Sequence, residues 1–232
     1  CKINIIKTQQ RDKYMFNDKI DSQVIGTLKI YDKDSGEILV QKKNAIHPGN
    51  MAYVLASALA NKPTSVNASG SAPSINWMAF GNGGSVSTTT LSYRSPRISS
   101  TYDQLPITSS GSSLYVPKYE QETINTVYYP GQDMSGKTVP NNTAKVNFSV
   151  NLTHADYATA VGETIPSSDS STDVTSVKAF TIDDIGLLSG VTDSGSLDTT
   201  KTLMLTHVTF HPVLLAANRT IVIDYTVTIQ IS

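Results

Sequence analysis

The C-terminal segment of the chain alternates between apolar and polar side chains. The odd positions carry Ile221, Ile223, Tyr225, Val227, Ile229 and Ile231, whereas Asp224, Thr226, Thr228 and Gln230 stand at even positions. Successive side chains of a β-strand point to opposite faces, so this pattern predicts a strand with one buried face. Such a strand must pair with other strands and cover its apolar side. The segment therefore constrains the architecture strongly and carries no catalytic signature.

Most of the remaining chain also consists of short strand-like runs between turn clusters. A Gly-containing turn at residues 32–36 separates two such runs and predicts a β-hairpin. The other predicted strands lie at residues 75–80, 122–129, 144–152, 178–188 and 203–213. Short strands joined by turns predict an antiparallel sandwich.

One segment has the pattern of a helix. Asn50 is a suitable N-cap, and apolar or small residues recur with helical spacing at Met51, Val54, Leu55, Ala58 and Leu59. Residues 61–63 end in proline and predict the end of this helix. Residues 155–161 are compatible with one further helical turn. The expected fold class is mainly β: an antiparallel β-sandwich with one short helix and a long loop-rich insertion.

The domain organisation expected from these patterns is a single sandwich with an arm. Residues 1–22 contain a charged run and predict an N-terminal arm that docks on another subunit. Residues 23–232 form the single β-sandwich domain, and residues of about 85–143 form the insertion. Within the insertion, residues 85–119 are rich in Ser, Thr and Pro and predict little regular structure.

Composition limits the possible partners and compartments. The 232 residues carry a net charge of -1, which supplies no basic face for nucleic acid or anionic lipid. The apolar runs are far shorter than the roughly 20 residues that span a bilayer. The one cysteine, Cys1, cannot form an intrachain disulfide, and it would be the acylated residue of a mature lipoprotein.

Several short motifs suggest binding sites but lack the rest of the required pattern. Residues 81–84 are Gly-rich without the Lys-Ser/Thr pair of a phosphate loop, so turn glycines are the better interpretation. Residues 32–37 superficially resemble a calcium loop, but Lys43 stands where the closing acidic ligand belongs. We expect a hairpin turn there, and no cofactor or metal in the protein.

The histidines and paired aspartates do not form a catalytic motif either. His207 and His211 lie about 13 Å apart along an extended strand, too far for one zinc ion. His47 and His154 lack acidic or cysteine neighbours, so loop or surface positions are expected. Asp183 and Asp184 are adjacent in a strand and are expected on opposite faces. Common hydrolase signatures are missing, and the sequence predicts that the protein is not an enzyme.

The order of the segments resembles that of a class of tailed-bacteriophage virion proteins. The matching elements are a hairpin ending in an Asn-containing loop, a small-residue helix, a strand before a Gly-rich turn, an acidic Ile-Gly-Leu strand, an aromatic-x-Pro strand and a final alternating strand. They correspond to residues 36–44, 50–60, 75–84, 182–188, 203–213 and 220–232. The likeness covers most of the chain from about Gln23, and departs from the pattern between Leu91 and Ala144.

The resemblance implies a noncatalytic virion subunit that is assembled in the host cytoplasm. Its work would be contact with other virion proteins and with copies of itself in a homo-oligomer, most simply in a tail or baseplate. Aromatic side chains are favoured at such contacts. The candidate contact residues are Tyr14, Phe16, Tyr102, Tyr115, Tyr119, Tyr128 and Tyr129. The tyrosines of the insertion have an alternative role, which is to pack the insertion onto its own sandwich.

Other functions stay open at this point. A capsid decoration or head-fibre protein would have the same sequence properties as a tail protein. A cell-surface adhesin or lipoprotein would require lipid on Cys1. A carbohydrate-binding module or glycan hydrolase would require aromatic side chains and a carboxylate pair gathered in a groove.

Overall fold

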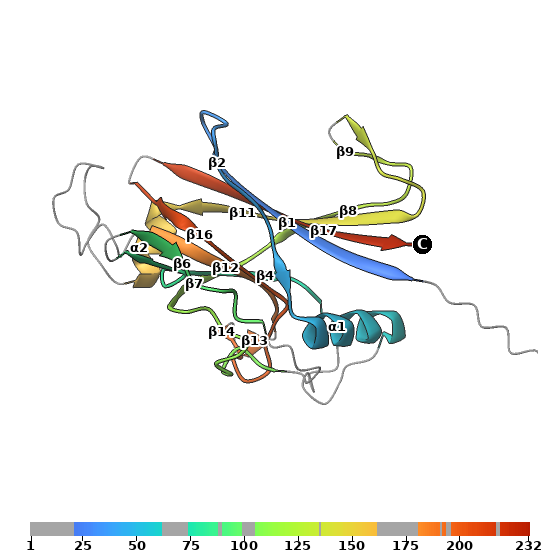
Figure 1. Ribbon diagram of the computed structural model, residues 1–232, viewed down its shortest axis with the longest axis horizontal. Coiled ribbons are helices and arrows are strands. Elements are labelled where there is room, and N and C mark those ends of the chain that lie inside the picture. The colour runs from blue at the N-terminus through green and yellow to red at the C-terminus, as the bar shows by residue number, and fades with distance from the viewer. Residues whose placement is uncertain are drawn as a thin grey trace, which may run out of the picture.

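Two antiparallel β-sheets pack face to face and share an apolar core (Figure 1). The computed structural model describes residues 21–61, 74–87, 90–98, 105–134, 136–161, 181–190, 192–193, 196–216 and 219–232. The expected mainly-β sandwich is confirmed. Residues 1–20 of the predicted arm lie outside the described residues.

The first sheet has five strands in the order β2-β1-β17-β11-β8. Their bounds are β1 (Ser22–Asp32), β2 (Ile38–Lys43), β8 (Ile124–Tyr128), β11 (Thr143–Thr153) and β17 (Thr220–Ile231). The central strand β17 pairs along its length with β1 and β11. Its residues Ile221, Ile223, Tyr225 and Val227 are buried, as predicted for the apolar face, whereas Ile231 at the end of the strand is 50% exposed.

The second sheet has the order β3-β16-β12-β4-β7, and β15 also pairs with β12. Its strands are β3 (Ala45–Ile46), β4 (Trp77–Gly81), β7 (Pro117–Glu122), β12 (Thr181–Ser189), β15 (Leu203–Met204) and β16 (Thr206–Leu214). Phe80, Ile185 and Phe210 from this sheet meet Ile30, Phe148 and Ile223 from the first in one cluster of buried side chains. The apolar faces of the two sheets thus close on each other.

Three two-stranded hairpins lie outside the main sheets. They are β5 (Ser85–Ser87) with β6 (Leu91–Tyr93), β9 (Asp133–Met134) with β10 (Lys137–Thr138), and β13 (Thr192–Asp193) with β14 (Ser196–Leu197). The β9–β10 hairpin lies beside β8 (Figure 1), and its Met134 and Lys137 line a pocket together with Thr27 and Asn147 of the first sheet.

The predicted strand at residues 122–129 is two strands in different sheets. Strand β7 belongs to the second sheet and β8 to the first, and only Thr123 separates them. The backbone amide of Thr123 donates to the carbonyl of Asn76 at 2.9 Å, which holds the crossing point. Residues 85–143 therefore contribute one edge strand to each sheet. A period of two shows strand character but does not reveal which sheet a strand joins.

Helix α1 (Pro48–Ala60) begins earlier than predicted. His47, not Asn50, is the N-cap, and its Nδ1 accepts from the backbone amide of Asn50 at 3.2 Å. Pro48 occupies the first helical position, where its missing N–H costs nothing. Asn61 ends the helix in the left-handed conformation, at φ 47°. The predicted C-terminal boundary is thus confirmed.

The buried side of α1 differs from the predicted stripe. Met51 and Val54 are buried against Leu203 and Leu205, as expected. Leu59, however, is 89% exposed. The helix covers one end of the sandwich, and burial along it ends at Ser57, since residues 58–60 are exposed.

A second helix corrects the expectation of one helix. α2 (His154–Val161) covers β7 and β11, and Tyr157 is fully buried in the main core. The oxygen of Thr153 accepts from the backbone amide of Asp156 at 3.2 Å, as in an N-terminal cap. No helix in the described part of the chain is long and apolar enough to cross a bilayer.

The hairpin between β1 and β2 has the predicted turn. One carboxylate oxygen of Asp32 accepts from the backbone amides of Asp34 and Ser35 at 3.0 and 2.8 Å. Gly36 has φ +71°, a conformation that favours glycine. The other carboxylate oxygen of Asp32 binds Arg219 Nε at 3.0 Å. The aspartate that suggested a calcium ligand is therefore used by the turn itself.

The outer ends of β1 and β17 meet at one corner of the first sheet. Asp21 donates its backbone amide to the carbonyl of Ser232 at 3.0 Å, and Ser232 donates back to Asp21 at 2.9 Å. The register continues inward from Ser22 opposite Ile231.

Candidate functional site

The candidate contact residues divide into three groups. Tyr14, Phe16 and Tyr102 lie outside the described residues. Tyr115 and Tyr119 pack largely within the molecule, and Tyr128 and Tyr129 lie at the end of the edge strand β8. The structure thus brings only the last pair together at an open surface.

Tyr119 and Tyr115 have internal partners. The Tyr119 ring stacks on Phe80 at 6.1 Å and meets Tyr157 edge-on at 6.3 Å. The guanidinium of Arg97 lies 4.0 Å from the centre of the Tyr115 ring, whose hydroxyl donates to the carbonyl of Ser95 at 2.7 Å. These contacts support the alternative in which the insertion packs onto its own sandwich.

A buried polar cluster lies where this insertion meets the second sheet. The backbone amide of Arg97 donates to Nδ1 of His207 at 2.7 Å. Since an accepting ring nitrogen carries no proton, this tautomer has its proton on Nε2. His207 Nε2 faces Asp184 Oδ2 at 3.5 Å, and both side chains are fully buried. The same Oδ2 accepts from the backbone amide of Tyr115 at 2.9 Å.

Asp183 binds the preceding part of the insertion. Its carboxylate accepts from the backbone amides of Gly84 at 2.7 Å and Ser85 at 2.9 Å, and from the Ser85 hydroxyl at 2.5 Å. Burial raises the pKa of Asp183, and these donors oppose the rise. A Cβ added to Gly84 would stand 2.4 Å from the carbonyl oxygen of Asp183, so only glycine fits there.

The two aspartates are not separated as the sequence predicted. The pairing of β12 with β16 shifts register between Ile182 and Asp184, so a β-bulge interrupts the alternation at Asp183. Both carboxylates consequently bind the segment that follows β4. The cluster fastens the insertion to the sheet and is sealed by it, which makes it a poor place for a substrate to reach.

The other histidine predictions also need correction. His47 and His154 were expected in loops or on the surface; His47 does lie in the loop between β3 and α1, but both side chains are buried. His47 caps α1, and His154 opens α2. Burial lowers the pKa of both imidazoles. His211 is exposed on β16, and no group of three metal-ligating side chains occurs within the described residues.

Three of the four terminal strands of the two described sheets have features that oppose further pairing. The edge strand β2 carries Lys42 and Lys43, and its ladder with β1 is irregular. The edge strand β3 has only two residues. Edge strand β7 contains Pro117 and several charges and contacts α2. Charge, irregularity, shortness, proline and coverage are the usual ways in which proteins protect sheet edges.

Strand β8 forms the fourth edge and has none of these protections. Residues 124–129 are Ile-Asn-Thr-Val-Tyr-Tyr and carry no charge. Ile124 is 67% exposed, Val127 44% and Tyr129 59%. The strand pairs in a regular register with β11 on one side only. We therefore take the β8 edge, defined as residues 124–129, as the candidate functional site.

The sequence alone indicated part of the β8 edge. The tyrosines pointed to residues 128 and 129, but Ile124 and Val127 were missed because strand character alone does not distinguish an edge strand from a central one. The useful signal was the contrast between the uncharged β8 edge and the lysines of β2. Comparisons of the chain with protein-family models, curated proteins and solved structures found no match.

Proposed function

We propose that this chain is a noncatalytic structural subunit of a bacteriophage virion, a tail or baseplate component that acts through protein–protein contacts. The β8 edge is the observation that carries the proposal. An exposed apolar edge strand without charge is a template for another strand. The order of sequence elements, which resembles that of tailed-phage virion proteins, supplies the virion context.

The partner that we propose for the β8 edge is the β8 edge of a second copy. Two antiparallel copies would be related by a twofold axis perpendicular to the sheet, so each side chain would stay on its own face. Val127 lies opposite Val146, which lies opposite Val227 on the core side of the sheet. Pairing would extend this apolar row across the interface and remove Val127 and Tyr129 from water.

Charge also favours self-pairing at this edge over the opposite one. Two uncharged β8 strands meet without electrostatic repulsion. Pairing of β2 with a second β2 would instead bring Lys42 and Lys43 of both copies together, and like charges on adjacent strands are destabilising. The first sheet therefore has one edge suited to self-association and one that opposes it.

The solution mass of wild type and of Val127→Lys tests the self-association. We expect wild type to scatter light as a multiple of its 25.0 kDa monomer mass. Val127→Lys should weaken association at least about tenfold, the effect of 1.4 kcal/mol. Gln41→Lys is the matched control, because it adds the same charge to the exposed part of the opposite edge strand and should leave the mass unchanged. A monomeric wild type, or an oligomer unaffected by Val127→Lys, would contradict the proposal.

The virion assignment requires a separate experiment. Gold-labelled antibodies against the chain should mark the tail or baseplate of particles of the phage that encodes it, viewed by negative-stain electron microscopy. Labelling confined to the head would replace the tail assignment with a decoration role. Particles without label would reject the virion assignment, whereas the mass of the isolated chain would still report on the β8 edge.

A further inference from the structure

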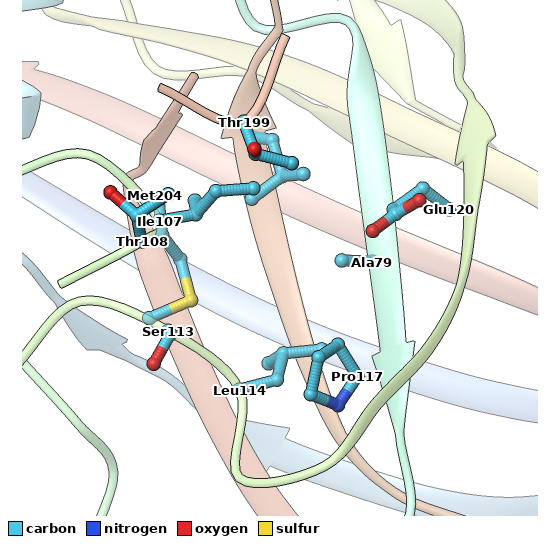
Figure 2. Close-up of a pocket in the computed structure, with 10 residues that line it drawn as sticks. Ala79, Ile107, Thr108, Ser113, Leu114, Pro117, Glu120, Thr199 and Met204 are labelled. Atoms are coloured by element: carbon cyan, nitrogen blue, oxygen red, sulfur yellow. The ribbon is translucent and has the colours of Figure 1, made fainter. Parts of the chain in front are cut away.

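A small apolar cavity opens on the second sheet, on the face turned away from the first sheet (Figure 2). Its volume is about 220 Å³. Ala79 of β4, Leu188 of β12 and Met204 of β15 form the sheet side, and Leu114 of the insertion covers them. The cavity is distinct from the β8 edge, which belongs to the other sheet.

The cavity has the size of one side chain or one small ligand. An apolar cavity of about 150 Å³ is large enough to take benzene, whereas pockets for drug-sized ligands begin at about 300 Å³. Its apolar lining favours an aliphatic group. Thr108, Ser113 and Thr199 add hydroxyl groups to the lining, and Glu120 is its one charged residue.

Glu120 supplies a single negative charge to this lining. It stands opposite Ala79 in the pairing of β4 with β7, so the two side chains share the outer face. Figure 2 shows its carboxylate beside Ala79, apart from the apolar floor. Burial alone raises the pKa of Glu120, and within the described residues no cation or hydrogen-bond donor offsets that burial.

Glu120 is only partly buried, so its carboxylate is open to a partner that comes from outside the molecule. A carboxylate accepts hydrogen bonds and attracts cations, so the group that would satisfy Glu120 is an ammonium or guanidinium. The adjacent cavity would hold the aliphatic chain of such a group. Lysine and arginine side chains have this composition, with an apolar stem and a charged head.

We infer that this cavity binds a short aliphatic chain that ends in a cationic amine or guanidinium. The chain would contact Leu114, Leu188 and Met204, and the cation would pair with Glu120. Two sources share this chemistry: a free alkylamine, and a lysine or arginine side chain of another polypeptide.

Methyl NMR of the full chain, labelled with ¹³C at its methionine methyl groups, provides the test. Met204 lines the cavity, and Met78 in the main core serves as a reporter of folding. Titration with n-pentylamine should shift the Met204 signal to saturation and leave the Met78 signal in place. The neutral n-pentanol should bind at least about tenfold more weakly, since it cannot form the ion pair.

Two glutamate variants distinguish the effect of the charge that lines the cavity from the effect of any negative charge on β7. Glu120→Gln should reduce pentylamine affinity to that of pentanol. Glu122→Gln is the matched control, because Glu122 is exposed two residues further along β7 and does not line the cavity. Equal binding of amine and alcohol by wild type, unchanged binding by Glu120→Gln, or no saturable shift of Met204 would overturn the inference.

The two sources are distinguished by a second titration. A short capped peptide with one central lysine is compared with pentylamine and with the same peptide carrying norleucine. Tighter binding of the lysine peptide than of pentylamine assigns the cavity to a polypeptide partner, and the reverse assigns it to a free amine. A norleucine peptide that binds as tightly as the lysine peptide would count against a cation-binding site.

Discussion

Asn50 joins three segments of the chain through one buried amide. Its Nδ2 lies 2.9 Å from the carbonyl oxygen of Leu105 and 2.8 Å from that of Met204, and its Oδ1 accepts from the amide of Leu105 at 2.9 Å. Ser112 Oγ lies 3.2 Å from the same Nδ2. One side chain in the first turn of α1 thus holds both the insertion and β15.

Replacement of Asn50 should consequently lower the free energy of unfolding substantially. Asn50→Ala would leave the carbonyls of Met204 and Leu105 and the amide of Leu105 without their buried partner, at about 1–3 kcal/mol for each unsatisfied group. We expect a loss of roughly 3 kcal/mol in the free energy of unfolding, measured in urea. Gln41→Ala, at an exposed position of β2, should cost well under half as much. Similar losses for the two variants would show that the Asn50 network contributes little.

His47 makes stability depend on pH. Burial lowers its pKa from the ordinary value of 6.5, so the folded protein takes up a proton less readily than the unfolded chain. The stabilisation is therefore present above the ordinary pKa and is lost as the pH falls toward the lowered value. A protonated ring would also cease to accept from Asn50 and would place a positive charge at a helix N-terminus.

His47→Asn should remove this contribution. Asparagine is a good N-cap and does not titrate. Between about pH 7.5 and about pH 5, the free energy of unfolding should fall less for the variant than for wild type. The buried His154 remains in both proteins, so its effect cancels in the difference. An equal fall in both would mean that His47 is not a source of the pH dependence.

At the residue scale, the sequence predicted local hydrogen bonding better than it predicted which side chains are buried. Asp32 was correctly placed in a turn because its hydrogen bonds to the turn amides reach only two or three residues along the chain. His47 and His154 were misplaced because their burial depends on segments far away in sequence. Asp183 and Asp184 were misread because a β-bulge cannot be seen in a two-residue alternation.

At the scale of the element, α1 offers a direct check of which side meets the core. Met51 is buried against Leu203 and Leu205, whereas Leu59 is almost wholly exposed. Met51→Ala should cost about 2–5 kcal/mol of unfolding free energy. Leu59→Ala should change it by less than about 0.5 kcal/mol, as is usual at exposed positions. A larger loss for Leu59→Ala than for Met51→Ala would restore the stripe predicted from sequence.

The predicted stripe failed at its C-terminal end because helical spacing repeats along the whole helix, while burial ends at Ser57. The predicted strand at residues 122–129 failed for a related reason. Strand propensity continues through Thr123, but the chain leaves one sheet and enters the other there. Element type follows from local pattern, whereas the length of contact and the choice of sheet depend on the rest of the fold.

At the scale of the molecule, backbone protection should follow strand order. In the monomer, amide hydrogen exchange should be slowest in β17, which is paired on both sides, and fast in β8, which is paired on one. On self-association, β8 should gain protection and β2 should not. Exchange that stays fast in β8 of the oligomer would place the interface elsewhere.

The whole fold was predictable at the level of class. Alternating strands, turn residues and a small number of helical segments were enough to predict the mainly-β sandwich. The β8 edge and the cavity at Glu120 were not predicted, because each depends on which strands lie next to one another. The sequence shows that β2 is charged and β8 is not. This contrast predicts which strand can pair with another chain only when both are known to be edge strands.

The reciprocal hydrogen bonds of Asp21 and Ser232 have a practical consequence for protein engineering. Residues 21 and 232 lie side by side, so in a chain shortened to residues 21–232 a short flexible linker would join them without disturbing β1 or β17. A circularly permuted sandwich would then open in the exposed β1–β2 turn, at the opposite end of those strands. Cargo attached at either new terminus would be displayed away from the Asp21–Ser232 corner.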